Sequence, residues 1–203
     1  MKSIYIYGAG GHGAVVAEIA EILGYNIIGF ADDDKGLKDR HVLHWKVLGT
    51  GESIPTGATV ALGIGDNNVR SALLVRARSR AWQLPVLVHP SAVISPSATL
   101  GEGTVVMANV VVNARTRTGA CCILNTACSV DHDCEIGEVV HIAPGVRLAG
   151  SVKVGDRTLV GIGSCARPGV SIGSDCVIGA GSVVVSDIPN GCVAYGNPAV
   201  PRN

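Results

Sequence analysis

Aromatic side chains are scarce in this chain of 203 residues, where one Phe, two Trp and four Tyr make up 3% of the composition. Proteins that bind single-stranded nucleic acid stack the bases on such rings, so the composition disfavours that class. Charged residues are also few, and 16 Lys and Arg balance 16 Asp and Glu. A balanced charge provides no general attraction to nucleic acid or to an acidic membrane surface. We therefore expect neither as a partner.

Long apolar runs are lacking as well. No stretch approaches the 18 consecutive apolar residues that indicate a transmembrane helix. The first residues of the sequence read directly as a strand, without the apolar segment of a secretory signal peptide. We expect a soluble, cytoplasmic protein.

A six-residue repeat is present instead, and it keeps its register from Val88 to Pro189. Counted from Val88, 15 of the 17 first positions are Val, Ile or Leu, and the fifth positions are nearly all small or β-branched. A helix requires apolar spacing near 3.6 and a half-buried strand requires alternation, so neither fits. A sustained period of six predicts a parallel β-helix. Three hexapeptides then form one coil, and residues that are three hexapeptides apart stack about 4.8 Å from each other.

This stacking rule explains two sets of residues. One set is a column of glycines, each one coil from the next, which we interpret as corners that need unusual backbone angles and close backbone approach: Gly101, Gly119, Gly137, Gly155 and Gly173. The other set is the cysteines of the fifth positions, Cys122, Cys128, Cys134 and Cys176. Neighbouring hexapeptides lie on different sides of the coil, too far apart for a disulfide. We expect these cysteines to be small buried hydrophobes in a reducing compartment.

The N-terminal segment predicts an α/β unit. Residues 2–7 read as a strand that leads into the glycine-rich turn GAGGHG, then into a helix that ends at Gly24 and a second strand, NIIGFADDD. The G-x-G-x-x-G spacing, with Asp32 about 20 residues further on, is typical of dinucleotide binding. A dinucleotide site needs two such halves, however, and only one is present before the repeats begin. One half can still hold a nucleotide diphosphate at a helix N-terminus, so we favour a nucleotide-sugar site. A dinucleotide site and a tight turn without ligand are the alternatives.

Further candidates follow the strands of this unit. A strand at 58–65 leads into a helix from about 67 to 82, and the glycine-rich strand-to-helix turn GIGDNN (63–68) contains Gly65 and Asn68. Open α/β sheets bind ligands at the carboxyl ends of their strands, so we expect Gly65 and Asn68 to bind substrate. Asp32 and Asp33 can accept hydrogen bonds from sugar hydroxyls, or they form a solvated acidic turn.

The densest polar cluster lies in the repeats, at residues 124–145. His132 is the third residue of its hexapeptide, which predicts an exposed corner, and Asp131 and Asp133 flank it. A carboxylate beside an imidazole fixes its tautomer and raises its basicity, so His132 is a candidate general base. We also expect Asn125, in the preceding hexapeptide, to bind substrate.

Metal binding is disfavoured. Only three histidines lie in the repeats, and they have no H-x-x-x-H spacing, nor do the cysteines have C-x-x-C spacing.

The stacking rule predicts a neighbour for His132, because it places Gly150 one coil away. We predict that the backbone N–H of Gly150 can donate to an oxyanion formed beside His132.

Six segments together resemble the PglD/NeuD-type sugar acetyltransferases of the hexapeptide-repeat superfamily, and the resemblance spans essentially the whole chain. They are IYIYGAGGHG, FADDDKG, GIGDNN, LNTACSVDHDCEIG, HIAPG and VVVSDIPNGCVAYGNPAVP. The resemblance implies a Rossmann-like nucleotide-sugar-binding domain over residues 1–85. It implies a left-handed β-helix with a C-terminal cap over residues 86–203, which binds acetyl-CoA in a homotrimer with active sites between subunits.

By position, the resemblance also implies the role of single residues. His132 is the general base and Asp133 raises its basicity, although Asp131 stays open as the residue that orients His132. The implied nucleotide-sugar positions are Gly10, Gly11, His12, Asp32 and Asp33, and the implied acetyl-CoA positions are His141, Ile162 and Ala180. His12 either binds the sugar or caps the first helix.

The sequence therefore predicts an acetyl-CoA-dependent N-acetyltransferase that acts on the 4-amino group of a nucleotide-linked amino-dideoxy sugar, with UDP as the expected nucleotide. Transfer is direct, because a shared cleft can bring both substrates together without an acyl-enzyme. One alternative is an O-acetyltransferase for a sialic-acid-type sugar. Another, from a different class, is a non-catalytic trimeric scaffold.

Overall fold

The computed structural model describes residues 2–202, which form two compact units divided between Leu87 and Val88. We call residues 1–87 the α/β unit and residues 88–203 the β-helix unit. The division falls two residues after the boundary expected from the sequence. Within residues 2–202, no helix has the length and apolarity needed to cross a bilayer.

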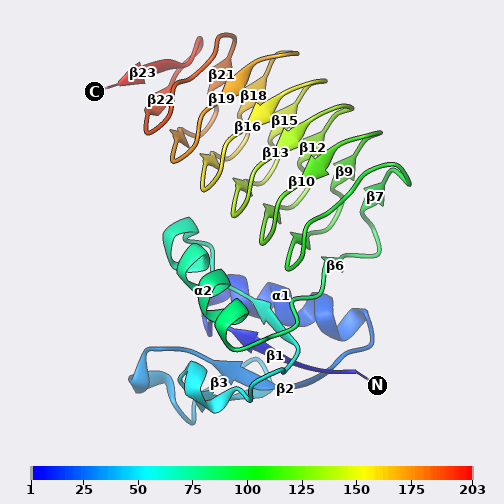
Figure 1. Cartoon of the computed structure of the whole chain (residues 1–203), viewed down its shortest axis with the longest axis vertical. Coiled ribbons are helices and arrows are strands. Elements are labelled where there is room, and N and C mark those ends of the chain that lie inside the picture. The colour runs from blue at the N-terminus through cyan, green and yellow to red at the C-terminus, as the bar shows by residue number, and fades with distance from the viewer. Residues whose placement is uncertain (1, 203) are drawn as a thin grey trace. The chain divides into compact units, whose positions relative to one another are not determined.

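The α/β unit is built on a five-stranded sheet in the order β3-β4-β2-β1-β5 (Figure 1). Strand β1 lies between β2 and β5, and all three are parallel, so their carboxyl ends meet at one edge. Helix α1 packs on these three strands through its apolar face. The bounds are β1 (Ser3–Tyr7), α1 (Gly11–Ile22), β2 (Asn26–Ala31), a 3-10 turn (Lys35–Leu37), β3 (His41–Val42), β4 (Trp45–Gly49), a second 3-10 turn (Gly51–Ser53), β5 (Val60–Leu62) and α2 (Asn67–Ser79).

The hairpin of β3 and β4 has no clear signal in the sequence. Its segment, HVLHWKVLG, lacks regular alternation of apolar and polar residues, and β4 buries only Val47. Tertiary contact specifies it instead, because Val47 pairs with Phe30 of β2 and the rings of Phe30 and Trp45 lie 6.4 Å apart. The other predicted elements are present, with α1 starting at Gly11, inside the glycine-rich turn.

The β-helix unit stacks short parallel strands in three ladders (Figure 1). We call them the first, second and third face. The first face contains β6 (Leu87–Val88), β8 (Val105–Val106), β11 (Ile123–Leu124), β14 (His141–Ile142), β17 (Leu159–Val160), β20 (Val177–Ile178), β22 (Val193–Tyr195) and the antiparallel β23 (Val200–Arg202). The second contains β7 (Val93–Ile94), β9 (Val111–Val112), β12 (Ser129–Val130), β15 (Arg147–Leu148), β18 (Cys165–Ala166) and β21 (Val183–Val184). The third contains β10 (Arg117–Thr118), β13 (Glu135–Ile136), β16 (Lys153–Val154) and β19 (Ser171–Ile172).

The period of six is confirmed by the register and by the core. Ile123 pairs with His141 and Ser129 pairs with Arg147, and in each pair the second residue lies three hexapeptides after the first. First positions such as Leu124 and Val130 are fully buried. The fifth-position cysteines are buried as well, and burial raises the pKa of the Cys128 thiol to about 12.

One part of the glycine interpretation is wrong. The glycines of the predicted column have no positive φ, so unusual backbone angles are not their role. Their role is to let the backbones of successive coils approach closely, because a Cβ at Gly101 would lie 2.3 Å from the carbonyl oxygen of Gly119. The left-handed backbone occurs two residues later, at the fourth positions, where Asp133 has a φ of 60°. Asp and Asn tolerate this conformation better than most residues.

Candidate active site

His132 projects from the corner between the second and third faces, directly after β12. Its Nδ1 atom lies 2.7 Å from Oδ2 of Asp133. The two side chains are 54% and 37% exposed, so the pair is open to a substrate. The exposed corner predicted from the hexapeptide position is confirmed.

Arg115 completes this arrangement from one coil earlier. Its Nε lies 2.6 Å from Oδ1 of Asp133 and its Nη2 lies 2.8 Å from Oδ2, a bidentate pair. The Arg115 guanidinium, followed by the hydrogen bond from His132, holds the pKa of Asp133 well below its usual range. An ionised carboxylate only accepts hydrogen bonds, so Nδ1 of His132 carries the proton that it donates to Asp133. Nε2 of the neutral imidazole is therefore the atom with a free lone pair.

Asp131 has a different contact. Its Oδ1 accepts from the backbone N–H of His132 at 2.8 Å and from Nδ2 of Asn113 at 2.8 Å, and these two bonds lower the pKa of Asp131. Asp131 thus holds the corner backbone, whereas Asp133 contacts the imidazole. This geometry favours Asp133 as the carboxylate that orients His132.

Gly150 lies against the face of the His132 imidazole. A Cβ at this position would lie 2.6 Å from Cε1 and 2.7 Å from Nε2, closer than real contacts allow. Gly150 is buried, and its backbone N–H donates to no acceptor within residues 2–202. The backbone of Gly150 thus lies close to Nε2 of His132, the place where the predicted oxyanion contact requires a donor.

His141 and Asn125 form a second polar pair on the first face. The Asn125 side-chain amide lies 3.0 Å from Nε2 of His141. Ile162, 60% exposed, and Ala180 lie one coil apart in the corner column between the first and second faces. His132 stands at the far corner of the second face, and the third face separates it from His141 along the chain. One chain therefore does not gather all predicted acetyl-CoA residues at His132.

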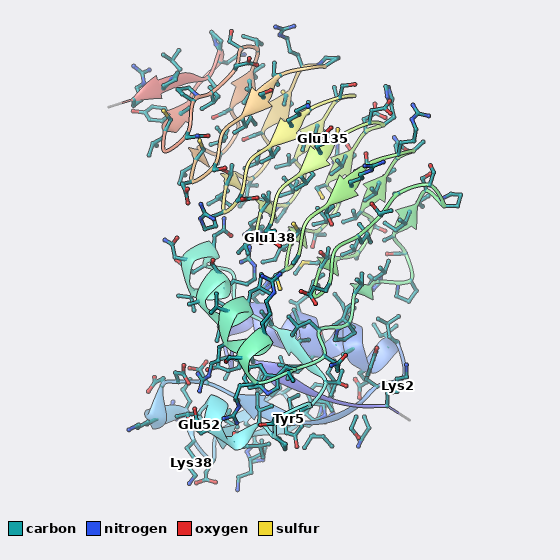
Figure 2. All side chains as sticks on the ribbon, viewed as in Figure 1. Lys2, Tyr5, Lys38, Glu52, Glu135 and Glu138 are labelled. Carbon is teal, nitrogen blue, oxygen red and sulfur yellow. The ribbon has the colours of Figure 1, made fainter. Side chains whose placement is uncertain are left out.

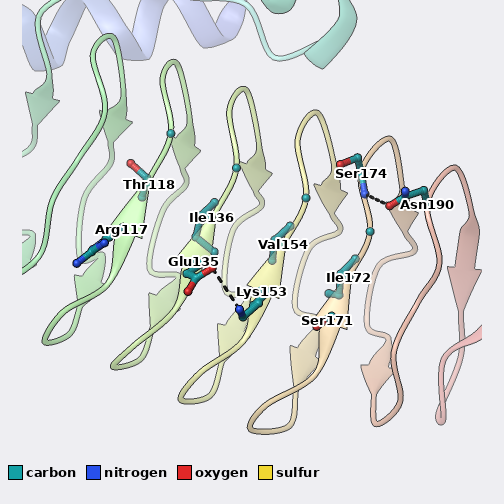
Figure 3. A pocket seen from close by; sticks show the side chains of 14 residues that line it. Arg117, Thr118, Glu135, Ile136, Lys153, Val154, Ser171, Ile172, Ser174 and Asn190 are labelled. Carbon is teal, nitrogen blue, oxygen red and sulfur yellow. Dashed lines mark hydrogen bonds and ion pairs between the residues drawn. The ribbon is translucent and has the colours of Figure 1, made fainter.

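Among the residues that the structure describes, hollows lie on the second and on the third face of the β-helix unit. One of 360 Å³ on the second face includes Asp131, Arg147 and Cys165 in its lining. The larger, of 480 Å³, crosses the third face and contains none of the predicted site residues. Figure 3 shows its outward row of Arg117, Glu135, Lys153 and Ser171, in which Lys153 pairs with Glu135 at 3.4 Å. We place the candidate site at His132, because the chemistry there is specific and the third-face row is an ordinary charge ladder.

The predicted residues of the α/β unit meet at the carboxyl edge of β2, β1 and β5. The glycines there are of two kinds. Gly13 and Gly8 pack the turn, since a Cβ at Gly13 would lie 1.9 Å from the carbonyl oxygen of Gly8. Gly10, Gly11 and Gly65 have open space instead, with nothing within 4 Å of an added Cβ. The open glycines are the ones able to admit a ligand close to the backbone.

The acidic pair after β2 is largely engaged within the unit. Asp32 accepts from the backbone N–H groups of Ala9 at 2.8 Å and Asp34 at 2.9 Å, and so joins this turn to the glycine-rich turn. Asp33 accepts from Arg76 at 3.1 Å and from the Gly51 N–H at 3.3 Å. Arg76 also donates to Glu52, labelled in Figure 2, at 2.7 Å. Sequence reasoning missed this network, because residues from four separate segments form it.

His12 lies in the first turn of α1 and is mostly buried. Burial, and then the charge of Arg70, lowers its pKa to about 4, so the imidazole is neutral at pH 7. Arg70 is itself buried and donates to the carbonyl oxygens of Ile64 and Gly65 at 2.9 and 3.1 Å. These bonds hold the second glycine-rich turn in place. Asn68 is exposed in the first turn of α2, next to this turn.

The two kinds of glycine predict different outcomes for alanine. Gly13→Ala forces a Cβ into backbone and is expected to cost about 3 kcal/mol of unfolding free energy, as severe overpacking does. Gly11→Ala, in open space at the start of the helix, is expected to leave stability nearly unchanged. Urea denaturation of both variants measures the difference. Equal stabilities would contradict the packing role of Gly13.

Comparison with known proteins finds relatives that match this chain over its full length. The family model of the PglD N-terminal domain matches residues 3–77, and that of the bacterial transferase hexapeptide (six repeats) matches residues 151–186. Perosamine N-acetyltransferase PerB of Caulobacter crescentus, solved with CoA and GDP-perosamine, is 39% identical, with a TM-score of 0.94 and coverage of 100% of this chain and 98% of that one. The acetyltransferase domain of PglB from Neisseria gonorrhoeae is 39% identical, with a TM-score of 0.92 and full coverage of both chains.

Other relatives share only a short segment. The putative acetyltransferase YJL218W of Saccharomyces cerevisiae is 53% identical over 45 residues, which are 22% of this chain and 23% of that protein. Galactoside O-acetyltransferase of Lactococcus lactis is 51% identical over 41 residues, 20% of each chain. This chain thus spans less than a quarter of the length of these curated relatives.

The hexapeptide β-helix, together with the full-length similarity to these acetyltransferases, places the chain among the acyltransferases of the hexapeptide-repeat class. Within that class, the chain belongs to the PglD-type family of sugar acetyltransferases, because solved members are 39% identical to it over its whole length. It is an enzyme of this family.

Proposed function

We propose that this protein transfers the acetyl group of acetyl-CoA to the amino group of a nucleotide-linked amino sugar. One observation carries the proposal: Nδ1 of the exposed His132 lies 2.7 Å from Oδ2 of an ionised Asp133, so Nε2 is the ring nitrogen left to act as a base. Acetyl-CoA is the acetyl donor, in keeping with the acetyl-CoA complex of the PglB domain and the CoA complex of PerB. A non-catalytic scaffold would have no need for this arrangement.

The reaction follows from the geometry of the corner. The amine nitrogen attacks the thioester carbonyl carbon, while Nε2 of His132 takes the proton that the amine loses. Asp133 stabilises the imidazolium that forms. The Gly150 N–H donates to the tetrahedral oxyanion. The carbon–sulfur bond then breaks, the CoA thiolate leaves, and the imidazolium returns its proton to the thiolate.

The acceptor lies at the carboxyl edge of the α/β unit in this proposal. The open glycines Gly10, Gly11 and Gly65 let a diphosphate approach backbone N–H groups, and His12, Asp32, Asp33 and Asn68 contact the nucleotide or the sugar. We propose the 4-amino group of an amino-dideoxy sugar as the acceptor. UDP is the nucleotide expected from the sequence, and GDP is the nucleotide of the sugar bound to PerB.

We propose a homotrimer in which each active site takes residues from two subunits. The support is that His132 and His141 project from different parts of the β-helix unit. One subunit provides His132, Asp133 and Gly150. A neighbouring subunit provides His141, paired with Asn125, together with Ile162 and Ala180 along the acetyl-CoA.

The direct test measures CoA-thiol release from acetyl-CoA with UDP-, GDP- and dTDP-linked 4-amino-dideoxy sugars and with free sialic acid. We expect rapid release with one nucleotide-linked amino sugar and an N-acetylated product by mass spectrometry. Release with sialic acid alone would establish the O-acetyl alternative. The absence of release with every acceptor, together with the absence of acetyl-CoA binding by calorimetry, would favour the scaffold.

A further inference from the structure

The carboxylate that binds His132 is itself held from one coil earlier. Oδ2 of Asp133 accepts from both Nδ1 of His132, at 2.7 Å, and Nη2 of Arg115, at 2.8 Å. Oδ1 accepts from Nε of Arg115 at 2.6 Å. Both oxygens are thus bound by Arg115, and the plane of the carboxylate is defined before a substrate arrives.

The backbone aligns this pair. Arg115 and Asp133 occupy the same corner position in successive coils, and both have a left-handed backbone, with φ of 62° and 60°. Their side chains therefore leave the corner in the same direction. A planar guanidinium can bind a carboxylate with two parallel hydrogen bonds, whereas the ammonium of lysine provides only a point charge.

We propose that Arg115 is a positioning residue for acetyl transfer, which fixes the Asp133 carboxylate so that it holds the His132 imidazole with Nδ1 protonated and Nε2 facing the substrate. This inference rests on the proposed general-base role of His132. Without Arg115, the Asp133 carboxylate keeps only its hydrogen bond with His132, so its plane is no longer fixed and the imidazole loses its fixed orientation and tautomer.

The chain contains a matched control for this pair. Arg157 and Asp175 also stand one coil apart at a corner, each with a φ of 56°. Nε of Arg157 lies 2.6 Å from Oδ1 of Asp175, and Nη2 lies 2.7 Å from Oδ2. No histidine contacts Asp175 among the hydrogen bonds and ion pairs described for residues 2–202. Replacing Arg157 therefore removes an equivalent Arg–Asp ion pair from another corner of the β-helix, one that does not contact His132.

The test compares Arg115→Ala, Arg115→Lys and Arg157→Ala in the full chain. We expect Arg115→Ala to lower kcat about tenfold, a part of the 10²–10⁴ that a general base contributes, with little change in the KM for acetyl-CoA. Arg115→Lys should recover part of this loss. Arg157→Ala should keep the wild-type kcat, and thermal melting should show similar small effects for Arg115→Ala and Arg157→Ala.

A spectroscopic measurement does not depend on activity. Nitrogen NMR shifts of the His132 ring, assigned by their loss in His132→Ala, report which ring nitrogen carries the proton. We expect the Nδ1-protonated form to dominate in the wild type and Arg157→Ala and to lose its dominance in Arg115→Ala. The inference would be overturned if Arg115→Ala kept both the kcat and the His132 tautomer of the wild type. It would also be overturned if Arg157→Ala lost as much kcat as Arg115→Ala. If the wild type transfers no acetyl group, the proposed function fails, while the tautomer still decides the role of Arg115.

Discussion

Replacing His132 with alanine is expected to lower kcat for acetyl transfer by about 10²–10⁴-fold, the usual contribution of a general base. The imidazole is more than half exposed, at 54%, and lies beside Gly150 and Asp133 at a corner, so we expect its removal to leave the core intact. Thermal melting should therefore stay close to wild type. The measurement is the initial rate of CoA-thiol release with the acceptor identified in the panel. Retention of the wild-type rate would remove His132 from the mechanism.

The same variant tests whether two subunits share the site. His132→Ala and His141→Ala chains, each weak in activity alone, are unfolded together and refolded as mixed oligomers. The His141→Ala chain keeps His132 and the His132→Ala chain keeps His141. An interface between the two variants can therefore contain both histidines, and activity should return. Each variant refolded by itself is the control. No recovery in the mixture, with oligomers of the correct mass, would indicate that both histidines act within one chain.

Replacing Gly150 with alanine is expected to reduce kcat about 100-fold, near the lower end of the contribution of a general base. The new Cβ would lie within 2.7 Å of two imidazole atoms, so the ring must turn away and lose the contact with Asp133. The backbone N–H remains in this variant, and the φ of Gly150 is not in the left-handed range. The expected loss therefore comes from displaced His132, not from a lost oxyanion donor or a strained backbone.

A double-mutant cycle separates these causes. In His132→Ala/Gly150→Ala the imidazole is absent and the clash disappears, so the double variant should be as active and as stable as His132→Ala. A further fall in activity of the double variant would show that Gly150 acts independently of His132. Crystal structures of both variants would show whether the ring has moved.

Several contacts of the site can be predicted from the sequence, because each coil has a constant length of three hexapeptides. This rule placed Gly150 next to His132, and the structure brings the two together. The same rule applied to Asp133 leads to Arg115, which sequence reasoning overlooked. The rule works because every residue in a β-helix contacts the residue one coil away, so the sequence separation of a contact is constant.

Other features needed the structure. Both acids beside His132 are equally near in sequence, and only the direction of the side chains assigns Asp133 to the imidazole and Asp131 to the backbone. One of the two roles assigned to the corner glycines, the unusual backbone angles, was wrong for a similar reason. Spacing identifies a column of glycines, but backbone angles and interatomic distances decide between a left-handed turn and close packing.

The sequence by itself determined the β-helix, its core and the His132 corner, because contacts in a coiled repeat are periodic along the chain. Only the tertiary structure decided the α/β unit in detail. It revealed the β3–β4 hairpin, the separation of packing glycines from open ones, and the network of Asp33 with Arg76. These features depend on contacts between distant segments and on side-chain direction, and neither leaves a periodic pattern in the sequence.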